Sequence, residues 1–237
     1  MSSPASLPES ARLRESARLR ESARLRERGA ATWAAAVTHP MVAAIGSGTL
    51  PHETFRFYFE QNVQYLHEYV RAIALTIAAA PDRSAQSVLA RFLGQIVDVE
   101  IPANLAFLAR LGGSAASLPD PLPTTRGYAS HLLATAREGN MAVALAALLP
   151  CQWSYGEIGQ RLTASGAPDD PVYADWIAMF SGDGYDDLVR ASTGLLDSCA
   201  RDASPAATAA AFDRATAYEL AFWEMAYTRG ASDGAGV

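Results

Sequence analysis

The stretch HETFRFYFEQNVQYLHEYVRAIALTIAAA, residues 52–80, decides the fold of this chain. Pro51 before it and Pro81-Asp82 after it are helix start and stop signals. Its large apolar side chains recur every three or four residues, the spacing of one face of an α-helix: Phe55, Phe59, Val63, Leu66, Val70, Ile73 and Ile77. The stretch therefore predicts one long amphipathic helix whose apolar face other helices must cover.

Helical spacing continues on both sides of this stretch. We predict a helix over 31–46, disturbed at His39-Pro40, and a long helix over 84–111. A loop with three prolines follows over 114–125, and further helices are predicted over 126–137, 141–163, 171–180, 185–200 and 204–229. The sequence contains no convincing strand and no Gly-rich phosphate loop. These features predict an all-α bundle of about eight helices.

The N-terminal segment differs from the rest of the chain. Glu-Ser-Ala-Arg-Leu-Arg occurs three times in tandem from Glu9 to Arg26, and a period of six does not place its leucines on one helix face. We interpret residues 1–28 as a solvated Arg-rich extension, helical or disordered. The alternative is an arm that binds an acidic partner. Residues 29–229 are predicted to form a single helical domain, and the tail 230–237 is predicted to be disordered.

Composition limits the function classes. The 237 residues carry a formal net charge of −6, which argues against nucleic acid as a partner. Two cysteines, Cys151 and Cys199, do not make a disulfide framework, so we expect a reducing, cytoplasmic location. No uninterrupted apolar run reaches the roughly 18 residues of a membrane span, and no signal-peptide pattern is present. We therefore expect no membrane partner.

Cys151 lies in the most informative stretch, Leu149-Pro150-Cys151-Gln152-Trp153-Ser154-Tyr155. Cys151 and Tyr155 are four residues apart, so they share one helix face. Pro150 marks either a kink or a first-turn position. If the thiol lies near a helix N-terminus, the partial positive charge there favours the thiolate. The alternative is that Cys151 is a small buried hydrophobic residue.

Two other helix faces carry polar side chains among apolar ones. Asn62 and Tyr65 are three residues apart on the 52–80 helix, and Asn62 either binds a ligand or is a hydrogen-bonded core amide. Glu219 is aligned with Phe222, three residues on, so its carboxyl group is expected to point inward, whereas Glu224 is expected to be solvated. Burial raises a carboxyl pKa and lets it carry a proton at neutral pH, although a structural role is equally open.

These stretches, in this order, resemble the TenA family over roughly residues 30–229. The motifs that carry the resemblance are His39-Pro40, Phe59-Glu60-Gln61 with Tyr65-Leu66, Leu149-Pro150-Cys151 with Trp153, Tyr155 and Ile158-Gly159, Trp176-Ile177, and Glu219 with Phe222-Trp223 and Met225-Ala226-Tyr227. The resemblance implies a haem-oxygenase-like helical bundle that assembles as a homotetramer. It implies thiamin salvage: members hydrolyse 4-amino-5-aminomethyl-2-methylpyrimidine to the hydroxymethylpyrimidine, and many cleave thiamin. No cofactor or metal is involved.

The resemblance also implies roles for individual residues. Cys151 is the nucleophile that adds to the pyrimidine ring, and Glu219 handles protons on the ring and on the attacking water. Tyr155 and Tyr128 orient the thiol and the ring. Tyr65 lines the pyrimidine pocket.

Two positions depart from the family pattern. Asn62 stands where the family normally has Asp, which costs a charge-assisted hydrogen bond to the pyrimidine. Phe180 stands where a Tyr is expected, which removes a hydroxyl from the pocket. These departures leave open a second hypothesis, a pyrimidine-binding protein without catalysis. A DNA-binding regulator, suggested by the Arg-rich repeat, and a haem- or di-iron-dependent enzyme of the same fold are further alternatives; no Glu-x-x-His pattern supports the di-iron enzyme.

Overall fold

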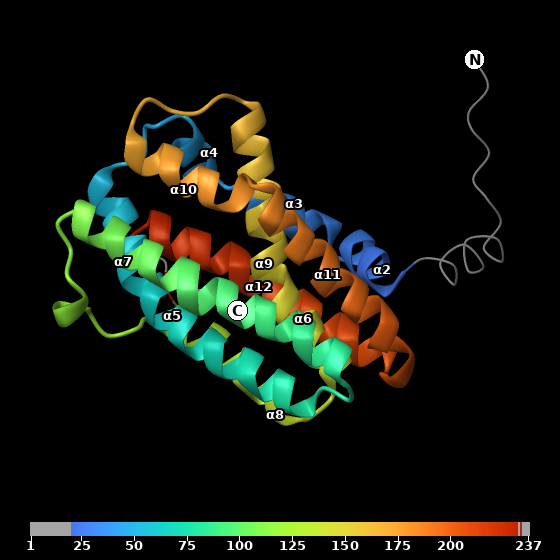
Figure 1. Cartoon of the computed structure of the whole chain (residues 1–237). Helices are drawn as coiled ribbons and strands as arrows, with labels where there is room; N and C mark the ends of the chain where they lie inside the picture. The colour runs from blue at the N-terminus through green and yellow to red at the C-terminus, as the bar shows by residue number, and fades with distance from the viewer. Residues whose placement is uncertain (1–19, 232, 234–237) are drawn as a thin grey trace, which may run out of the picture.

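The computed structural model describes residues 20–231 and 233, and every regular element in this part of the chain is a helix (Figure 1). The prediction of an all-α protein is thereby confirmed. The elements in chain order are α2 (Glu21–Arg28), α3 (Ala30–Val37), α4 (Pro40–Gly46), α5 (His52–Ala79), α6 (Arg83–Gly94), the π-helix η1 (Gln95–Glu100), α7 (Ile101–Arg110), the short 3₁₀-helix η2 (Ala115–Ser117), α8 (Pro123–Arg137), α9 (Met141–Ala164), α10 (Pro171–Ser181), α11 (Asp183–Cys199), the 3₁₀-helix η3 (Ala200–Asp202) and α12 (Pro205–Tyr227).

Helix α9 is the central element of the bundle. It packs against α12, α10, α11 and α8, while α5 lies along α8 and also contacts α12. Every residue of α9 from Met141 to Gln152 is buried. A helix that is hydrophobic on all sides belongs in the interior of a protein, and this explains why the surrounding helices are arranged around α9.

Pro150 lies inside α9, not in a first turn. Proline has no amide hydrogen, so the carbonyl group of Ala146 receives no helical hydrogen bond from it. Cys151 consequently sits in mid-helix, ten residues after Met141. Of the two positions that the sequence left open for Pro150, the first turn is excluded, and a helix N-terminus does not stabilise the thiolate, because that effect falls off within the first turn.

The helix predicted over 84–111 is interrupted by a π-helix, η1, between α6 and α7. A π-helix has one more residue in its turn than an α-helix, and it is frequent at functional sites. In η1 the side chains of Ile96 and Glu100 are buried, whereas Val97 and Val99 are 43% and 44% exposed. The interruption therefore points a carboxyl group into the bundle.

The same run, Arg83–Arg110, is long and apolar enough by length and composition to cross a membrane, with 33% of its most apolar window buried. The sequence predicts no membrane-spanning helix when only uninterrupted apolar runs are counted. By the criterion of length and mean hydropathy, that expectation does not hold. The indication is weak, because helices of soluble proteins meet the same criterion. Here the run packs against α5 and α11.

Both ends of the described chain are packed against the bundle. Helix α2 contacts α11 and α12, and Leu25 is fully buried. Of the two states expected for the extension, helical or disordered, Glu21–Arg28 is helical, but it is packed against the bundle and not solvated. Residues 1–19 lie outside the described residues. At the other end Asp233 accepts a hydrogen bond of 3.1 Å from the backbone N–H of Thr124. The predicted disorder of the tail does not hold there, and residues 232 and 234–237 lie outside the described residues.

The break at His39-Pro40 is confirmed. The Nδ1 atom of His39 accepts a 3.2 Å hydrogen bond from the backbone N–H of Met41 and so caps α4. Its Nε2 atom lies 3.1 Å from Oε2 of Glu224 on α12. Elsewhere the predicted boundaries shift slightly: α8 begins at Pro123 and α11 at Asp183.

Candidate active site

Glu219 is the buried carboxyl group of the candidate site. Its side chain points inward from α12 and is 3% exposed, as the sequence predicts. Oε1 accepts a hydrogen bond of 2.6 Å from the hydroxyl of Tyr128 on α8. Burial raises the pKa of Glu219 to about 7, while interactions with the Tyr128 hydroxyl and the Cys151 thiol hold it down. Glu219 can therefore accept and return a proton at neutral pH. Glu224 is half exposed, as predicted.

Cys151 lies on α9 with its side chain buried. Burial raises the pKa of the thiol well above its usual value, and the nearby charges of Glu219 and Glu100 raise it further. The thiol is therefore protonated at neutral pH, opposite to the lowered pKa that a helix N-terminus would give. A nucleophilic Cys151 needs a base to take its proton, and Glu219 is a carboxyl group whose pKa the thiol lowers.

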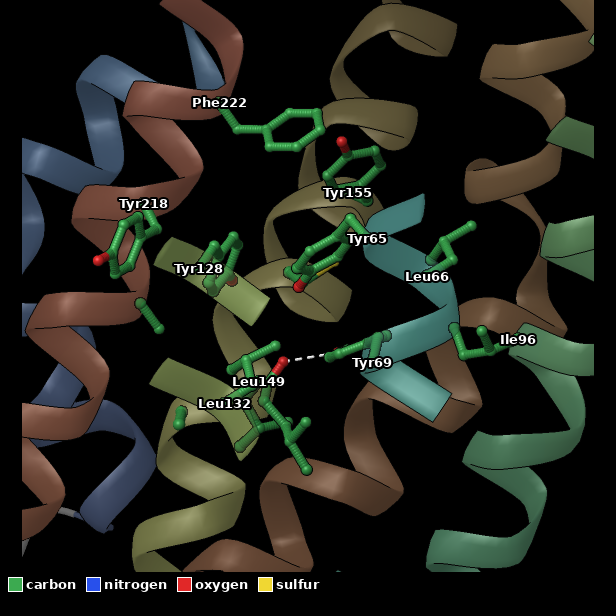
Figure 2. Packing of buried hydrophobic residues seen from close by; sticks show 14 of the residues in the cluster. Tyr65, Leu66, Tyr69, Ile96, Tyr128, Leu132, Leu149, Tyr155, Tyr218 and Phe222 are labelled. Atoms are coloured by element: carbon green, nitrogen blue, oxygen red, sulfur yellow. Dashed lines mark hydrogen bonds between the residues drawn. The ribbon is translucent and has the colours of Figure 1, made fainter. Parts of the chain in front are cut away.

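Aromatic rings from four helices surround this pair. Figure 2 shows Tyr65 of α5, Tyr128 of α8, Tyr155 of α9 and Phe222 of α12 converging on one region. The rings of Tyr65 and Tyr128 are 4.8 Å apart and those of Tyr65 and Phe222 are 5.9 Å apart. The structure thus brings Tyr65 and Tyr128 together beside Glu219, where a flat ring could stack.

Tyr155 occupies one side of the site. Its hydroxyl is 2.9 Å from the hydroxyl of Tyr58 on α5, and its ring is 4.9 Å from the ring of Phe180 on α10. Phe180 is 2% exposed and contributes no polar atom. The hydrogen-bond partner of Tyr155 is therefore Tyr58, a residue that the sequence reasoning did not single out.

Asn62 lies on α5, one turn before Tyr65, and is 7% exposed. Its Nδ2 donates a hydrogen bond of 2.9 Å to Oδ1 of Asn104 on α7. The sequence left open whether Asn62 is a core amide or a ligand-binding group. The amide is half satisfied, because only its nitrogen has a hydrogen-bond partner among the described residues.

Glu100 is a second buried carboxyl group that the sequence reasoning missed. It is 5% exposed, and burial raises its pKa to about 8. Its Oε1 has no hydrogen-bond partner in the described part of the chain. The sequence signal for Glu100 is weak, because of its neighbours four residues away Ile96 is apolar but Asn104 is polar, and their burial is seen only in the structure.

Other polar atoms around Tyr155 are also buried without partners in the described residues. They belong to rings that pack with it: Trp223 and Trp176 lie 5.4 Å and 5.9 Å from the Tyr155 ring, and the Nε1 atoms of both have no hydrogen bond. The hydroxyl of Tyr65 is likewise buried without a hydrogen-bond partner among the described residues. Buried polar groups usually have partners, so this set has the hydrogen-bonding capacity that a polar heteroaromatic ligand would use.

The site residues lie in a stretch that matches a known family. The family model described as TENA/THI-4/PQQC covers residues 26–229. The chain belongs to this family. The resemblance to TenA proteins is thereby confirmed, and the match begins within the helix α2 that the sequence reasoning had set apart as an extension.

Individual relatives agree with this TenA assignment. A curated relative from Halalkalibacterium halodurans, named aminopyrimidine aminohydrolase, is 35% identical over 201 residues, which cover 82% of this chain and 90% of that protein. The solved structure of a TenA homologue from P. horikoshii OT3 superposes with a TM-score of 0.82 and 30% identity, covering 90% of this chain and 100% of that one.

The fold of this TenA-family chain is the one expected. A solved domain from Shewanella denitrificans OS217, described as having a heme oxygenase-like fold, matches with a TM-score of 0.67 at 15% identity and covers 98% of this chain and 100% of that one. The haem-oxygenase-like helical bundle is therefore confirmed. Among the described residues, no group of three His, Cys, Asp or Glu side chains is placed to hold a metal ion.

Proposed function

We propose that this chain is a hydrolase that replaces the amino group of an aminomethyl-substituted aminopyrimidine by a hydroxyl, with Cys151 as the nucleophile. One observation carries the proposal. Glu219, with a pKa of about 7, interacts with both the Tyr128 hydroxyl and the Cys151 thiol in a buried aromatic site. The name of the relative from Halalkalibacterium halodurans supports the same reaction.

The first half of the reaction needs a proton to move from sulfur to the ring. The ionised carboxylate of Glu219 takes the proton of the Cys151 thiol, and the sulfur forms a bond to a ring carbon. The electron pair displaced from that carbon moves onto a ring nitrogen, which receives the proton back from Glu219. Once aromaticity is lost, the exocyclic C–N bond can break: the ring nitrogen returns its proton to Glu219, Glu219 passes it to the amino group, and ammonia leaves an exocyclic methylene group on the ring.

The second half restores the ring. Water adds its oxygen to the exocyclic methylene carbon left by ammonia, and Glu219 takes up one of its protons. The C–S bond then breaks, the electron pair returns to sulfur, and Glu219 gives the proton taken from water to the sulfur of Cys151. The net change is water in and ammonia out. The neighbouring rings of Tyr128, which is held by Glu219, and of Tyr65 support the proposal, because the pyrimidine can be oriented by stacking against them.

The test is turnover of 4-amino-5-aminomethyl-2-methylpyrimidine and of thiamin, followed by release of hydroxymethylpyrimidine. Wild type is expected to turn over the aminomethyl substrate, and Cys151→Ser to lose nearly all of this rate. Cys199→Ser is the matched control and should keep it, because Cys199 lies at the end of α11, outside the site described here. Equal turnover by wild type and Cys151→Ser would contradict the proposed mechanism.

A second candidate function is pyrimidine binding without catalysis. The neutral amide of Asn62 and the apolar ring of Phe180 favour it, because the first lacks the charge and the second lacks the hydroxyl that the family pattern supplies. Calorimetry separates the two functions. Binding of hydroxymethylpyrimidine together with no turnover of any amino analogue would favour this second function over hydrolysis.

We also propose that the chain acts as a homotetramer in the cytoplasm, with a small pyrimidine as its ligand and neither nucleic acid nor a membrane as a partner. The exposed Val97 and Val99 of η1 support burial of this face against another copy. Light scattering on the purified chain should give the mass of four copies. A monomer at micromolar concentration would contradict the tetramer.

A further inference from the structure

Asn62 is the first member of a directed chain of hydrogen bonds. Its Nδ2 donates to Oδ1 of Asn104 at 2.9 Å, and Nδ2 of Asn104 donates to the backbone carbonyl oxygen of Glu100 at 2.7 Å. Asn104 is 1% exposed, so water does not compete for either bond. The three residues come from α5, α7 and η1.

The direction of this chain is fixed from its far end. A backbone carbonyl oxygen only accepts hydrogen bonds, so Asn104 must turn its NH₂ group toward Glu100. Its Oδ1 is then left facing Asn62, and that oxygen also only accepts. Asn62 must therefore turn its own NH₂ group toward Asn104. An amide rotated the other way would place two oxygens against each other in a buried position.

The direction of this chain determines the role of the remaining polar atom of Asn62, its carbonyl oxygen. Its Oδ1 has no hydrogen-bond partner among the described residues, and Asn62 retains 7% exposure beside Tyr65. The site is thus offered the carbonyl oxygen of this amide as an acceptor, while the NH₂ group, including its second N–H, stays on the side of Asn104. A freely rotating asparagine would offer either one.

We infer that Asn104 is a positioning residue that holds Asn62 with its carbonyl oxygen toward the ligand, so the site selects a pyrimidine with a hydrogen-bond donor at that edge. This inference rests on the proposed function. The donor on the ligand is an amino group attached to the pyrimidine ring. An analogue with only a ring nitrogen acceptor at that edge leaves Oδ1 of Asn62 unpaired and is rejected.

The test compares two ligands that carry no leaving group, so that binding is measured without turnover. They are 4-amino-5-hydroxymethyl-2-methylpyrimidine and its analogue without the 4-amino group. Calorimetry on the full chain should show that wild type binds the amino compound more tightly, by roughly tenfold to a hundredfold. Equal affinity for the two would overturn the inference and leave the proposed function standing. Binding of neither would overturn the proposed function itself.

Two variants of Asn104 separate positioning from a merely structural role. Asn104→Leu removes the acceptor, so Asn62 can rotate and offer its NH₂ group to the ring nitrogen of the analogue. The preference should then fall to within about threefold. Asn104→Asp keeps an acceptor facing Asn62, and its preference should remain that of wild type. Both variants lose the bond to Glu100, so a shared loss of preference would overturn the inference.

A third variant needs no change at Asn104. Asn62→Asp places a carboxylate against the fixed Oδ1 of Asn104. A charge-assisted bond would otherwise tighten binding of the amino compound by roughly tenfold. We expect a gain of no more than about threefold near pH 7, because one carboxylate oxygen faces another oxygen. A full tenfold gain would show that Asn104 turns freely and would overturn the inference.

Discussion

The hydroxyl of Tyr128 donates a 2.6 Å hydrogen bond to Oε1 of Glu219, and both side chains are buried. Burial and the charge of Glu219 raise the pKa of Tyr128 well above its usual value, so the phenol keeps its proton and remains the donor. This bond occupies one oxygen of the carboxyl group. In the proposed reaction the other oxygen, Oε2, exchanges protons with the Cys151 thiol and the substrate.

The pH dependence of the reaction should follow Glu219. Only the ionised carboxylate can take the thiol proton, so kcat/KM is expected to rise as pH increases through about 7, the pKa of Glu219. Glu219→Gln should lower kcat by roughly 10²–10⁴-fold and remove this limb of the profile. Steady-state rates from pH 5 to 9 measure both effects. Glu224→Gln, the same change on the exposed side of α12, is the control. A wild-type pH profile in Glu219→Gln would count against Glu219 as the proton-transferring group.

The Cys151 thiol should react slowly with alkylating reagents. Its pKa lies well above the usual value because of burial and the charge of Glu219, and the reactive thiolate becomes about tenfold scarcer for each pKa unit gained. With iodoacetamide at pH 7, native Cys151 is expected to be modified at least about tenfold more slowly than free cysteine. Mass spectrometry of digests measures this, and both cysteines should react once the chain is unfolded. Rapid native labelling would indicate a stabilised thiolate instead.

The free energy of unfolding should fall with rising pH because of Glu100. Burial raises the pKa of this carboxyl group from its usual 4.5 to about 8. Below pH 4.5 it is protonated in both states. Between these values only the unfolded state releases the proton, so stability is lost as pH rises, by about 1.4 kcal/mol per pH unit from this group. Above about 8 the loss levels off.

Glu100→Gln tests this dependence. The variant should flatten the slope between pH 4.5 and 8 and should be more stable than wild type at pH 8, as measured by urea unfolding. Glu219 contributes a slope of the same sign up to about pH 7, so part of the dependence remains. Exposed Glu138→Gln is the control and should leave the slope unchanged. An unchanged slope in Glu100→Gln would show that Glu100 ionises normally.

The Arg-rich segment should contribute stability rather than recognition. Leu25 is fully buried between α2 and the bundle, so Leu25→Ala should lower the free energy of unfolding by about 2–5 kcal/mol. Arg28→Ala breaks only a half-exposed ion pair with Asp213 and should cost less than about 1 kcal/mol. Activity per folded molecule is expected to stay unchanged in both. Loss of activity at full stability would point to a binding role for the segment.

Helical spacing was sufficient to predict most of the fold and part of the site. The alignment of Glu219 with Phe222 predicts a buried carboxyl group, and the structure places it there with a raised pKa. The four-residue spacing of Cys151 and Tyr155 correctly puts both on α9. These predictions succeed because local periodicity determines which face of a helix is buried.

Features set by packing between distant segments were not predictable in this way. Pro150 is a helix breaker by local preference, yet the surrounding helices keep α9 continuous through it. The state of the Cys151 thiol depends on burial and on carboxyl groups from other helices. The six-residue repeat argued against a buried stripe, but the buried Leu25 together with polar contacts such as Ser22 to Asp197 and Arg26 to Glu157 docks α2. Asn104 and Tyr58 are recognised only through partners far away in the sequence.

The π-helix η1 confines a difference in chain length to one turn. A π-turn is equivalent to one residue inserted into an α-helix, so removing a single residue from Gln95–Glu100 would let α6 and α7 join as one regular helix. Because the π-turn absorbs the extra residue locally, the side chains of α7 would keep their orientation relative to those of α6. Asn104 would therefore stay against Asn62, and the deletion would change only the side chains of the turn itself. In this chain the length of η1 can vary by one residue without moving the amide that holds Asn62.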